Sequence, residues 1–349
     1  MGINSALGSS ALLPAGLGFR NVLINGGFNI NQRAFISTTA DSTFGFDRWF
    51  CFMSGATTTY STQAFAVGNA ISGQEPTNHA RVVSTISGVG DYSILAQKIE
   101  DVRTCAGQRV TVSFWAKAAS GTPSIAVELA QSFGSGGSAE VNGSNGGVTA
   151  KVAITTSWAR YSITGVIPSI SGKTVGTSSW LGCLLWTSAG SNYNVRTGSI
   201  GIQNNTIDFW GVQLEQNYQP TPFEQRPIGV ELALCQRYYE TSYISPHAAG
   251  TATTLGIHLG SGTAASRTTG EIRDSHQFMV EKRATPSVTL YSNTGQINTV
   301  TRADYGIAYN GNRTGNVTDP SRKSFGVYSG DSGAHGSALL FHFVAEAEL

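Results

Sequence analysis

The stretch IDFWGVQLEQNYQPTPFEQRPIGVELALCQRYYE, residues 207–240, places a strand, a proline-rich turn and one short helix in immediate succession. Trp210, Val212 and Leu214 alternate with the residues between them, which is the period of two typical of a strand with a buried face. Pro220 and Pro222 end this strand, because proline cannot continue a hydrogen-bonded ladder. We therefore expect a junction here, with one β domain before it and another after it.

The helix of this junction is expected to begin at Pro227, whose fixed φ suits a first helical turn. On a helical wheel the apolar side chains cover an arc of roughly 200°. An arc this wide predicts contacts on two sides, either with the two domains of one chain or with neighbouring subunits. The residues of the arc are Val230, Leu232, Leu234, Cys235, Tyr238 and Tyr239.

Composition indicates a turn-rich protein built from strands. The chain has 349 residues, which suggests about two domains. Only 12% of the residues are charged, about half the usual share, and 42 are glycine. The net charge of +1 shows no excess of basic residues of the kind that binds nucleic acid or an anionic membrane. No apolar run approaches the roughly 18 residues needed to span a bilayer, so membrane insertion is not expected.

Strand patterns recur through both halves of the chain, and none before Ile228 reads as a helix. They predict an all-β protein with a jelly-roll or β-sandwich domain, a short linker helix and a second, smaller β-sandwich domain. In the first half the candidate strands are 22–30, 44–52, 80–87, 92–99, 109–118, 152–155, 158–167, 180–186 and 207–214. In the second half they are 253–259, 277–282, 287–291, 305–309, 324–328 and 338–345.

The predicted divisions are an N-terminal segment 1–20, a jelly-roll domain 21–224, a linker helix 225–240 and a C-terminal sandwich 241–349. The first 20 residues are small and patchily apolar, too few for a domain. They are either a flexible tail or a peptide that docks on another protein.

Several fixed spacings resemble those of a family of bacteriophage tail-fibre and receptor-binding proteins. The resemblance covers residues 21–240 well and the remainder weakly. It implies a jelly-roll, carbohydrate-binding-like module on a virion, usually within a homotrimer, with the N-terminal segment contacting other virion proteins. The motifs that carry it are NVLINGGF (21–28), FDRW (46–49), SFWAK (113–117), PSISGKT (168–174), GVQLE (211–215), TPFE (221–224), RP (226–227) and ELALCQRYY (231–239), with weaker matches at RATPSVT (283–289) and AEAEL (345–349).

Cysteine usage favours a protein made in a reducing compartment. Four widely spaced cysteines form no CxxC pair, so neither a zinc site nor a disulfide framework is expected. Cys183 and Cys235 lie inside apolar patterns and are expected to be buried free thiols. The N-terminus shows no export signal. We therefore expect synthesis in a cytoplasm. The phage resemblance implies that this is the cytoplasm of a host bacterium and that the final location is the virion, on the tail more readily than on the head.

Catalytic motifs are absent from the sequence. It contains no GxSxG or HExxH, and its six histidines are scattered. Glu128 and Glu215 are the strand-borne glutamates to inspect for glycoside hydrolysis. Asp47 and Arg48 are interpreted as a structural ion pair beside a core tryptophan, Trp49. The sequence thus predicts a non-enzymatic protein without a catalytic cofactor.

Sugar recognition needs flat aromatic side chains and a few hydrogen-bonding groups. On the strand 180–186 two tryptophans share one face with Gly182, which leaves a shallow place for a flat ligand. The alternative is that each tryptophan simply completes the core. The candidate aromatic residues are Trp115, Trp180, Trp186 and Tyr193, with Lys117, Asn192 and Asn194 as polar partners.

The resemblance also implies a possible structural calcium ion near the first and last strands of the jelly roll. The matching positions are Asn25 or Asn29 and Asp208. A hard cation usually needs more than one carboxylate, and Asn29 stands where a glutamate would strengthen the site.

Two functions from different classes follow. The first is a phage adhesin that binds a bacterial surface polysaccharide or lipopolysaccharide. The alternative is a structural head-fibre, capsid decoration or baseplate protein that binds other virion proteins. No heptad repeat is present, so any fibre is short.

Overall fold

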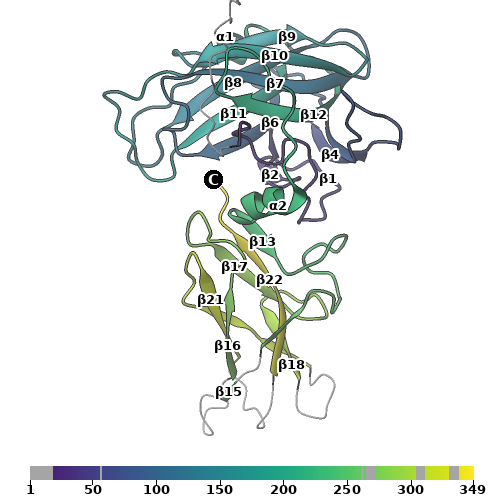
Figure 1. Ribbon diagram of the computed structural model, residues 1–349, viewed down its shortest axis with the longest axis vertical. Coiled ribbons are helices and arrows are strands. Elements are labelled where there is room, and N and C mark those ends of the chain that lie inside the picture. The colour runs from purple at the N-terminus through teal and green to yellow at the C-terminus, as the bar shows by residue number, and fades with distance from the viewer. Residues whose placement is uncertain (1–18, 56, 261–262, 265–271, 304–310, 330–337) are drawn as a thin grey trace, which may run out of the picture.

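Two β-sandwiches lie one on each side of a short helix, as Figure 1 shows. The computed structural model describes residues 19–55, 57–260, 263–264, 272–303, 311–329 and 338–349. The predicted all-β class, with a jelly-roll sandwich, one linker helix and a smaller second sandwich, is confirmed. Most of the N-terminal segment 1–20 and the candidate strand 305–309 lie outside the described residues.

The first sandwich consists of two six-stranded antiparallel sheets. Sheet A contains, in spatial order, β1 (Ser37–Thr38), β4 (Thr59–Ala64), β5 (Asn78–Val83), β12 (Thr206–Glu215), β7 (Arg109–Ala118) and β10 (Ala159–Val166). Sheet B contains β2 (Thr43–Phe44), β3 (Phe50–Ser54), β6 (Tyr92–Glu100), β11 (Trp180–Ala189), β8 (Ser124–Ser132) and β9 (Val148–Ala153). The chain crosses between the sheets several times, so central neighbours such as β12 and β7 or β6 and β11 are far apart in sequence, whereas β2-β3, β4-β5 and β8-β9 are consecutive. Strands β1, β4 and β8 fall outside the ranges predicted from sequence.

The core of this sandwich is formed by the inward faces of the two sheets. Val112 and Phe114 of β7 are fully buried there, as the alternation along that strand predicts. Leu181 and Cys183 of β11 face them from sheet B. All four cysteines are free and buried, which confirms the prediction for Cys183 and Cys235.

Residues 22–30 are not the strand that their aromatic and β-branched content predicts. Asn25 and Phe28 have φ angles of 57° and 56°, which lie outside the extended region. The Asn25 side chain holds the resulting loop. Its Oδ1 accepts hydrogen bonds from the Asn29 and Ile30 amides at 2.9 and 3.0 Å, and its Nδ2 donates to the carbonyl oxygens of Ile30 and Asp47 at 2.8 and 3.0 Å. The hydrogen bonds of this buried asparagine side chain therefore take the place of the strand-to-strand hydrogen bonds that a strand over 22–30 would form.

Asp47 and Arg48 do not pair with each other. The Asp47 carboxylate accepts hydrogen bonds from Gln32 and lies 3.9 Å from Arg33. Arg48 has a φ of 72°, so its side chain points away from Asp47, toward Glu348 and the Lys98 carbonyl. The tight turn that they share separates β2 from β3, which the sequence predicted as one strand. Trp49 is a core residue, as expected.

The second sandwich is built around the long strand β22. The larger sheet contains β13 (Tyr239–Thr241), β22 (Ala338–Glu346), β18 (Thr299–Ala303) and β19 (Asn312–Thr314), with β14 (His258–Gly260) and β17 (Ser287–Tyr291) also paired to β22. The smaller sheet contains β15 (Thr263–Ala264), β16 (Ile272–Gln277), β21 (Ser324–Ser329) and β20 (Asn316–Thr318). Phe325, Phe341 and Phe343 meet in the core between the two sheets.

The predicted strand 277–282 is wrong, since β16 ends at Gln277. The following residues turn so that Lys282, which is 0% exposed, can donate hydrogen bonds to the Glu240 carboxylate and the Gln236 carbonyl. A buried ammonium must be paired, and its partners are a carboxylate on β13 and a carbonyl oxygen at the end of α2.

Helix α2 (Ile228–Gln236) lies between the sandwiches. It is shorter than the predicted range 225–240, because Tyr239 and Glu240 already belong to β13 and pair with β22. In the part of the chain that the structure describes, no helix has the length and apolar character needed to cross a membrane.

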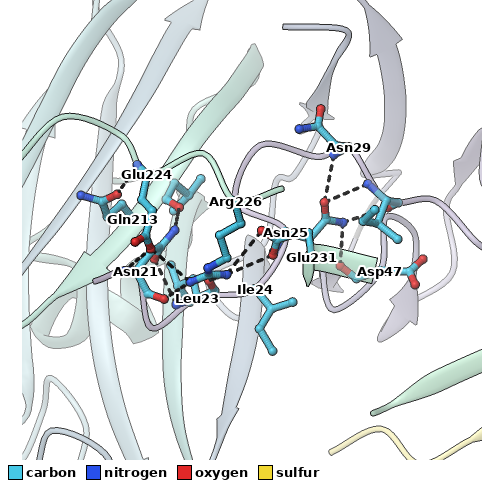
Figure 2. A network of polar contacts seen from close by, with 12 residues as sticks. Asn21, Leu23, Ile24, Asn25, Asn29, Asp47, Gln213, Glu224, Arg226 and Glu231 are labelled. Carbon is cyan, nitrogen blue, oxygen red and sulfur yellow. Dashed lines mark hydrogen bonds and ion pairs between the residues drawn. The ribbon is translucent and has the colours of Figure 1, made fainter. Parts of the chain in front are cut away.

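A buried polar network fastens α2 to the beginning of the first sandwich (Figure 2). The Arg226 guanidinium donates hydrogen bonds to the carbonyl oxygens of Asn21 and Leu23 and pairs with Glu231 at 3.1 Å. Glu224 accepts a hydrogen bond from the Asn21 amide at 2.9 Å. Segments about 200 positions apart in the chain are therefore joined through one linker.

A second set of contacts fixes the second sandwich against the first. The Arg48 guanidinium lies 3.5 Å from the centre of the Tyr238 ring, at the end of α2. Arg237 forms two hydrogen bonds of 2.8 Å with Glu100 at the end of β6. Glu348, which follows β22, pairs with Arg48. The C-terminal end of the chain thus lies at the junction, under the first sandwich (Figure 1).

Arg226→Met should lower the free energy of unfolding by about 3–5 kcal/mol, because it leaves a buried carboxylate and two carbonyl oxygens without their donor. The measurement is urea unfolding. Arg103→Met, which removes an exposed pair with Asp101, is the control and should change stability by less than about 0.5 kcal/mol. Equal effects of the two changes would contradict the structural role of Arg226.

Candidate functional site

The outward face of sheet B carries a hollow of about 270 Å³, which we call the aromatic hollow. Its lining combines aromatic rings, a few aliphatic side chains and two charged groups. The lining residues are Phe52, Tyr92, Ile94, Ala130, Glu140, Trp180, Leu184, Trp186, Tyr193 and Arg196.

Strand register creates this hollow. Across the sheet, Phe52 of β3 lies opposite Ile94 of β6, and Ile94 lies opposite Trp186 of β11. Two outward positions along β11 from Trp186, Gly182 lies opposite Ala130, which is an outward position of β8. Small residues between rows of large ones leave a depression in the sheet surface.

Gly182 is needed because the Trp180 ring leans across it. A Cβ at this position would lie 2.8 Å from the Trp180 ring and 2.9 Å from Leu184. The shallow place that the sequence predicts above Gly182 is therefore occupied by the indole of Trp180. That indole is half-buried and forms one wall of the hollow.

The floor contains Trp186, which is 1% exposed and belongs to the cluster of apolar residues on this face. Its Nε1 donates a 2.9 Å hydrogen bond to Glu128. Glu128 is fully buried and also accepts hydrogen bonds from Arg196 and from the Gly143 amide. This set of bonds locks Arg196 over the floor, with both oxygens of the carboxylate in use.

A short helical turn, not predicted from sequence, forms the rim. It consists of η1 (Ser191–Tyr193) and α1 (Asn194–Thr197). The Tyr193 ring lies 5.2 Å from that of Tyr92 and 5.4 Å from that of Trp186, measured between ring centres. Asn192 and Asn194 are exposed on the same turn. Neither asparagine lines the hollow, so the structure does not bring these two predicted polar partners into it.

The hollow has the chemistry to contact a flat, hydroxylated ring. Trp180 and Tyr193 offer half-buried aromatic surface, which can cover the apolar face of a pyranose. Burial raises the pKa of Tyr92, so its hydroxyl stays protonated and can donate a hydrogen bond. Glu140 and Arg196 add an acceptor and a donor at the edge.

The predicted sugar-binding residues divide between two faces. Trp180, Trp186 and Tyr193 come together in the aromatic hollow, with Trp186 in its floor. Trp115 and Lys117 of β7 point outward from sheet A, on the other side of the core. They contribute to a separate hollow.

The structure does not assemble the predicted calcium ligands. The Asn25 oxygen already accepts two backbone hydrogen bonds. Asn29 contacts Thr77, and both Asp208 oxygens accept hydrogen bonds from Arg81. Within the described ranges, no cluster of three or more His, Cys, Asp or Glu side chains is suited to hold a metal ion.

The two inspected glutamates belong to different sheets and do not face each other across a cleft. The Glu128 carboxylate accepts hydrogen bonds from Trp186, Arg196 and the Gly143 amide. Glu215, at the end of β12, accepts hydrogen bonds from the Gln213 side chain and from the amide and hydroxyl of Thr221. Both carboxylates therefore support local structure.

Phe52, Tyr92, Glu140 and Arg196 line the hollow but were missed by sequence reasoning. Phe52 and Tyr92 lie in strands that the sequence did predict. The sequence did not predict the strand order β3-β6-β11, which places both residues on the same sheet face as Trp180 and Trp186 of β11. Arg196 is placed by the unpredicted turn, and Glu140 by the glycine-rich connection 132–150.

No protein-family model matches this chain, and the search of curated proteins finds no match. Among solved structures, it is similar to the enzymatically active domain of tailspike protein 4 of bacteriophage CBA120, with 12% identity and a TM-score of 0.33 over 57% of this chain. The chain spans 22% of the length of that protein. It is also similar to a family 11 carbohydrate-binding module from Clostridium thermocellum, with 12% identity and a TM-score of 0.32, covering 53% of this chain and 99% of that one. For a putative sugar-binding protein from Bacteroides thetaiotaomicron the values are 11% identity, a TM-score of 0.34, and 56% and 100% coverage.

Trp186→Ala should lower the free energy of unfolding by about 3–5 kcal/mol, because it empties a buried position and leaves Glu128 without one donor. Trp180→Ala should lower the free energy of unfolding by only about 1–2 kcal/mol, since that ring is half-exposed. Thermal unfolding followed by circular dichroism distinguishes them. If Trp180→Ala is as damaging as Trp186→Ala, Trp180 is a core residue and not a wall of the hollow.

Proposed function

We propose that this protein is a non-enzymatic phage virion adhesin that binds a bacterial surface glycan in the aromatic hollow. The observation that carries the proposal is the convergence of Trp180, Tyr193 and Tyr92 with polar groups around a hollow of about 270 Å³. The resemblance of residues 21–240 to phage tail-fibre proteins supports the virion location. The ligand class is a surface polysaccharide or the carbohydrate of a lipopolysaccharide.

The physical basis of the affinity is stacking and hydrogen bonding. A net charge of +1 provides no general attraction to an anionic cell surface. Contacts with aromatic rings are insensitive to screening by salt, whereas exposed charge pairs weaken. Binding in the aromatic hollow should therefore persist as ionic strength rises.

A non-enzymatic role agrees with the state of the carboxylates. A glycoside hydrolase of the common type needs two carboxyl groups that flank one bond. Here the carboxylate nearest the hollow floor, Glu128, is saturated by an arginine, an indole and an amide. Glu140 at the rim is 38% exposed and has no second carboxylate in the lining.

Trp180→Ala should reduce binding to host cells roughly 5- to 30-fold, because the loss of one stacking contact between an indole and a sugar ring costs about 1–2 kcal/mol. The measurement is flow cytometry of host cells labelled with fluorescent protein, together with competition against phage adsorption. Tyr218→Ala, at a tyrosine that is 74% exposed and outside the hollow, is the matched control and should bind normally.

Normal labelling by Trp180→Ala would overturn the assignment of this site. If correctly assembled wild-type protein neither labels host cells nor competes with phage, the structural alternative, binding to other virion proteins, replaces the adhesin.

The homotrimer implied by the family resemblance has a candidate contact on α2. Of the nine residues of this helix, only Cys235 is buried within one chain. Val230, Ala233 and Leu234, together with Val280, line an open apolar hollow of about 380 Å³. Such a surface favours association, since it would otherwise remain in contact with water.

Leu234→Asp should convert the trimer into monomers without unfolding them, because the charge falls on an open apolar face. Light scattering measures the mass and circular dichroism the fold. Leu255→Asp, at an exposed leucine elsewhere in the second sandwich, is the control. A wild-type protein that is monomeric at micromolar concentration would contradict the proposed assembly.

A further inference from the structure

The outward face of sheet A carries a second hollow, of about 330 Å³, which we call the basic hollow. It lies between the loop 69–72 and three side chains, those of Trp115, Lys117 and Trp158. Trp115 and Lys117 alternate with the buried Phe114 and Ala116 along β7, so they face away from the core. The basic hollow is therefore separated from the aromatic hollow by the whole thickness of the sandwich.

Two half-buried tryptophans line the basic hollow. Trp158, just before β10, packs against Phe65 and His79, with 5.4 Å between the ring centres in each case. Trp115 lies beside Gly211, where an added Cβ would come within 3.1 Å of the indole. These contacts fix both rings while leaving part of each accessible, as stacking on a ligand requires.

The charge arrangement at this hollow differs from that of the aromatic hollow. Asp208, which is 3% exposed, receives hydrogen bonds of 2.7 and 2.9 Å from Arg81, one to each carboxylate oxygen. His79 Nε2 and Lys117 Nζ lie 3.3 and 3.6 Å from the same carboxylate. Two permanent cations thus surround one carboxylate, which leaves a positive charge uncompensated. The acidic residue of the adjoining loop, Glu75, accepts a hydrogen bond from the Gly68 amide and is not part of the lining.

Lys117 is the cation available to a ligand. Its side chain is 33% exposed, and its ammonium lies 5.3 Å from the centre of the Trp158 ring. The ammonium lies 3.6 Å from the Asp208 carboxylate, which is longer than a hydrogen bond. Since Arg81 already satisfies Asp208, Lys117 can turn its donors toward the hollow without leaving a buried carboxylate unpaired.

Asp208 keeps its negative charge over the whole physiological range. Burial alone would raise its pKa, but the hydrogen bonds from Arg81 and the nearby His79 ring, 3.3 Å away, outweigh that effect and lower the pKa to about 2. Asp208 therefore holds Arg81 firmly and stays ionised at any pH near neutrality.

We propose that the basic hollow binds a sugar ring that carries a carboxylate, with Lys117 pairing with the acid group and the two tryptophans covering the ring. This is a second binding site, independent of the aromatic hollow. It would give the protein selectivity for acidic polysaccharides that stacking alone does not provide.

The test is isothermal titration of the full-length protein with oligosaccharides of galacturonate, glucuronate and N-acetylneuraminate, each also as its methyl ester. Esterification removes the charge and keeps the ring and the linkage. At least one acid form should bind, and its ester should bind roughly tenfold more weakly, as expected for the loss of a charge-assisted hydrogen bond. The affinity for the acid form should fall as salt is added.

Lys117→Met should reduce binding of the acid form to the level of the ester, and Trp158→Ala should abolish both. The control is Lys173→Met, because Lys173 also lies over an aromatic ring, that of Phe133 at 5.9 Å, but outside the hollow. Trp180→Ala should leave this binding unchanged, which separates it from binding in the aromatic hollow.

The proposal is overturned if none of the three acidic oligosaccharides binds, if acid and ester bind equally, or if Lys117→Met has no effect. Circular dichroism of each variant establishes that it is folded. Should Trp158→Ala fail to fold, Lys117→Met still decides the result, because its side chain is partly exposed and makes no hydrogen bond to other described residues.

Discussion

The architecture depends on the buried guanidinium of Arg226. Its partners come from two distant parts of the fold: the Asn21 and Leu23 carbonyl oxygens at the start of the first sandwich, and the Glu231 carboxylate on α2. A buried arginine must have its donors satisfied, so these elements have one acceptable arrangement. The orientation of α2 follows from it. The residues that follow α2 then position the second sandwich, through the contacts of Arg237 with Glu100 and of Lys282 with Glu240.

This constraint explains where the phage-fibre resemblance lies. NVLINGGF, FDRW, TPFE and ELALCQRYY come together around the junction, where they supply Asn25, Arg48, Glu224 and Tyr238. These motifs specify how two sandwiches are joined. The residues of the aromatic hollow lie elsewhere, on outward positions of β11 and the strands beside it. Trp115 and Lys117 of the basic hollow, by contrast, belong to the motif SFWAK (113–117). The junction and the aromatic hollow are thus encoded by different parts of the sequence.

The regular elements could be predicted where a period of two continues without interruption. The bounds of β7 and β17 match the predicted strands 109–118 and 287–291, and the inward face of β7 is the predicted one. The strand predictions were wrong where the hydrogen bonds of a buried polar side chain fix a loop instead. Asn25 does this in residues 22–30, and Lys282 does it beyond β16. For the site, sequence identified Trp180 and Tyr193, but it could not separate them from Trp115. Strand order decides which outward residues share a face, and the pairing of β11 with β6 and β8 depends on contacts between distant segments.

We propose that the glycan binds the outward face of sheet B and not the junction. The most direct measurement is a crystal structure of the protein with an oligosaccharide repeat unit prepared from the surface polysaccharide of the host. The account predicts a sugar ring against Trp180 and Tyr193, with the contacts of Arg226 and Arg48 unchanged. A sugar bound at the junction around α2, with the aromatic hollow empty, would contradict it.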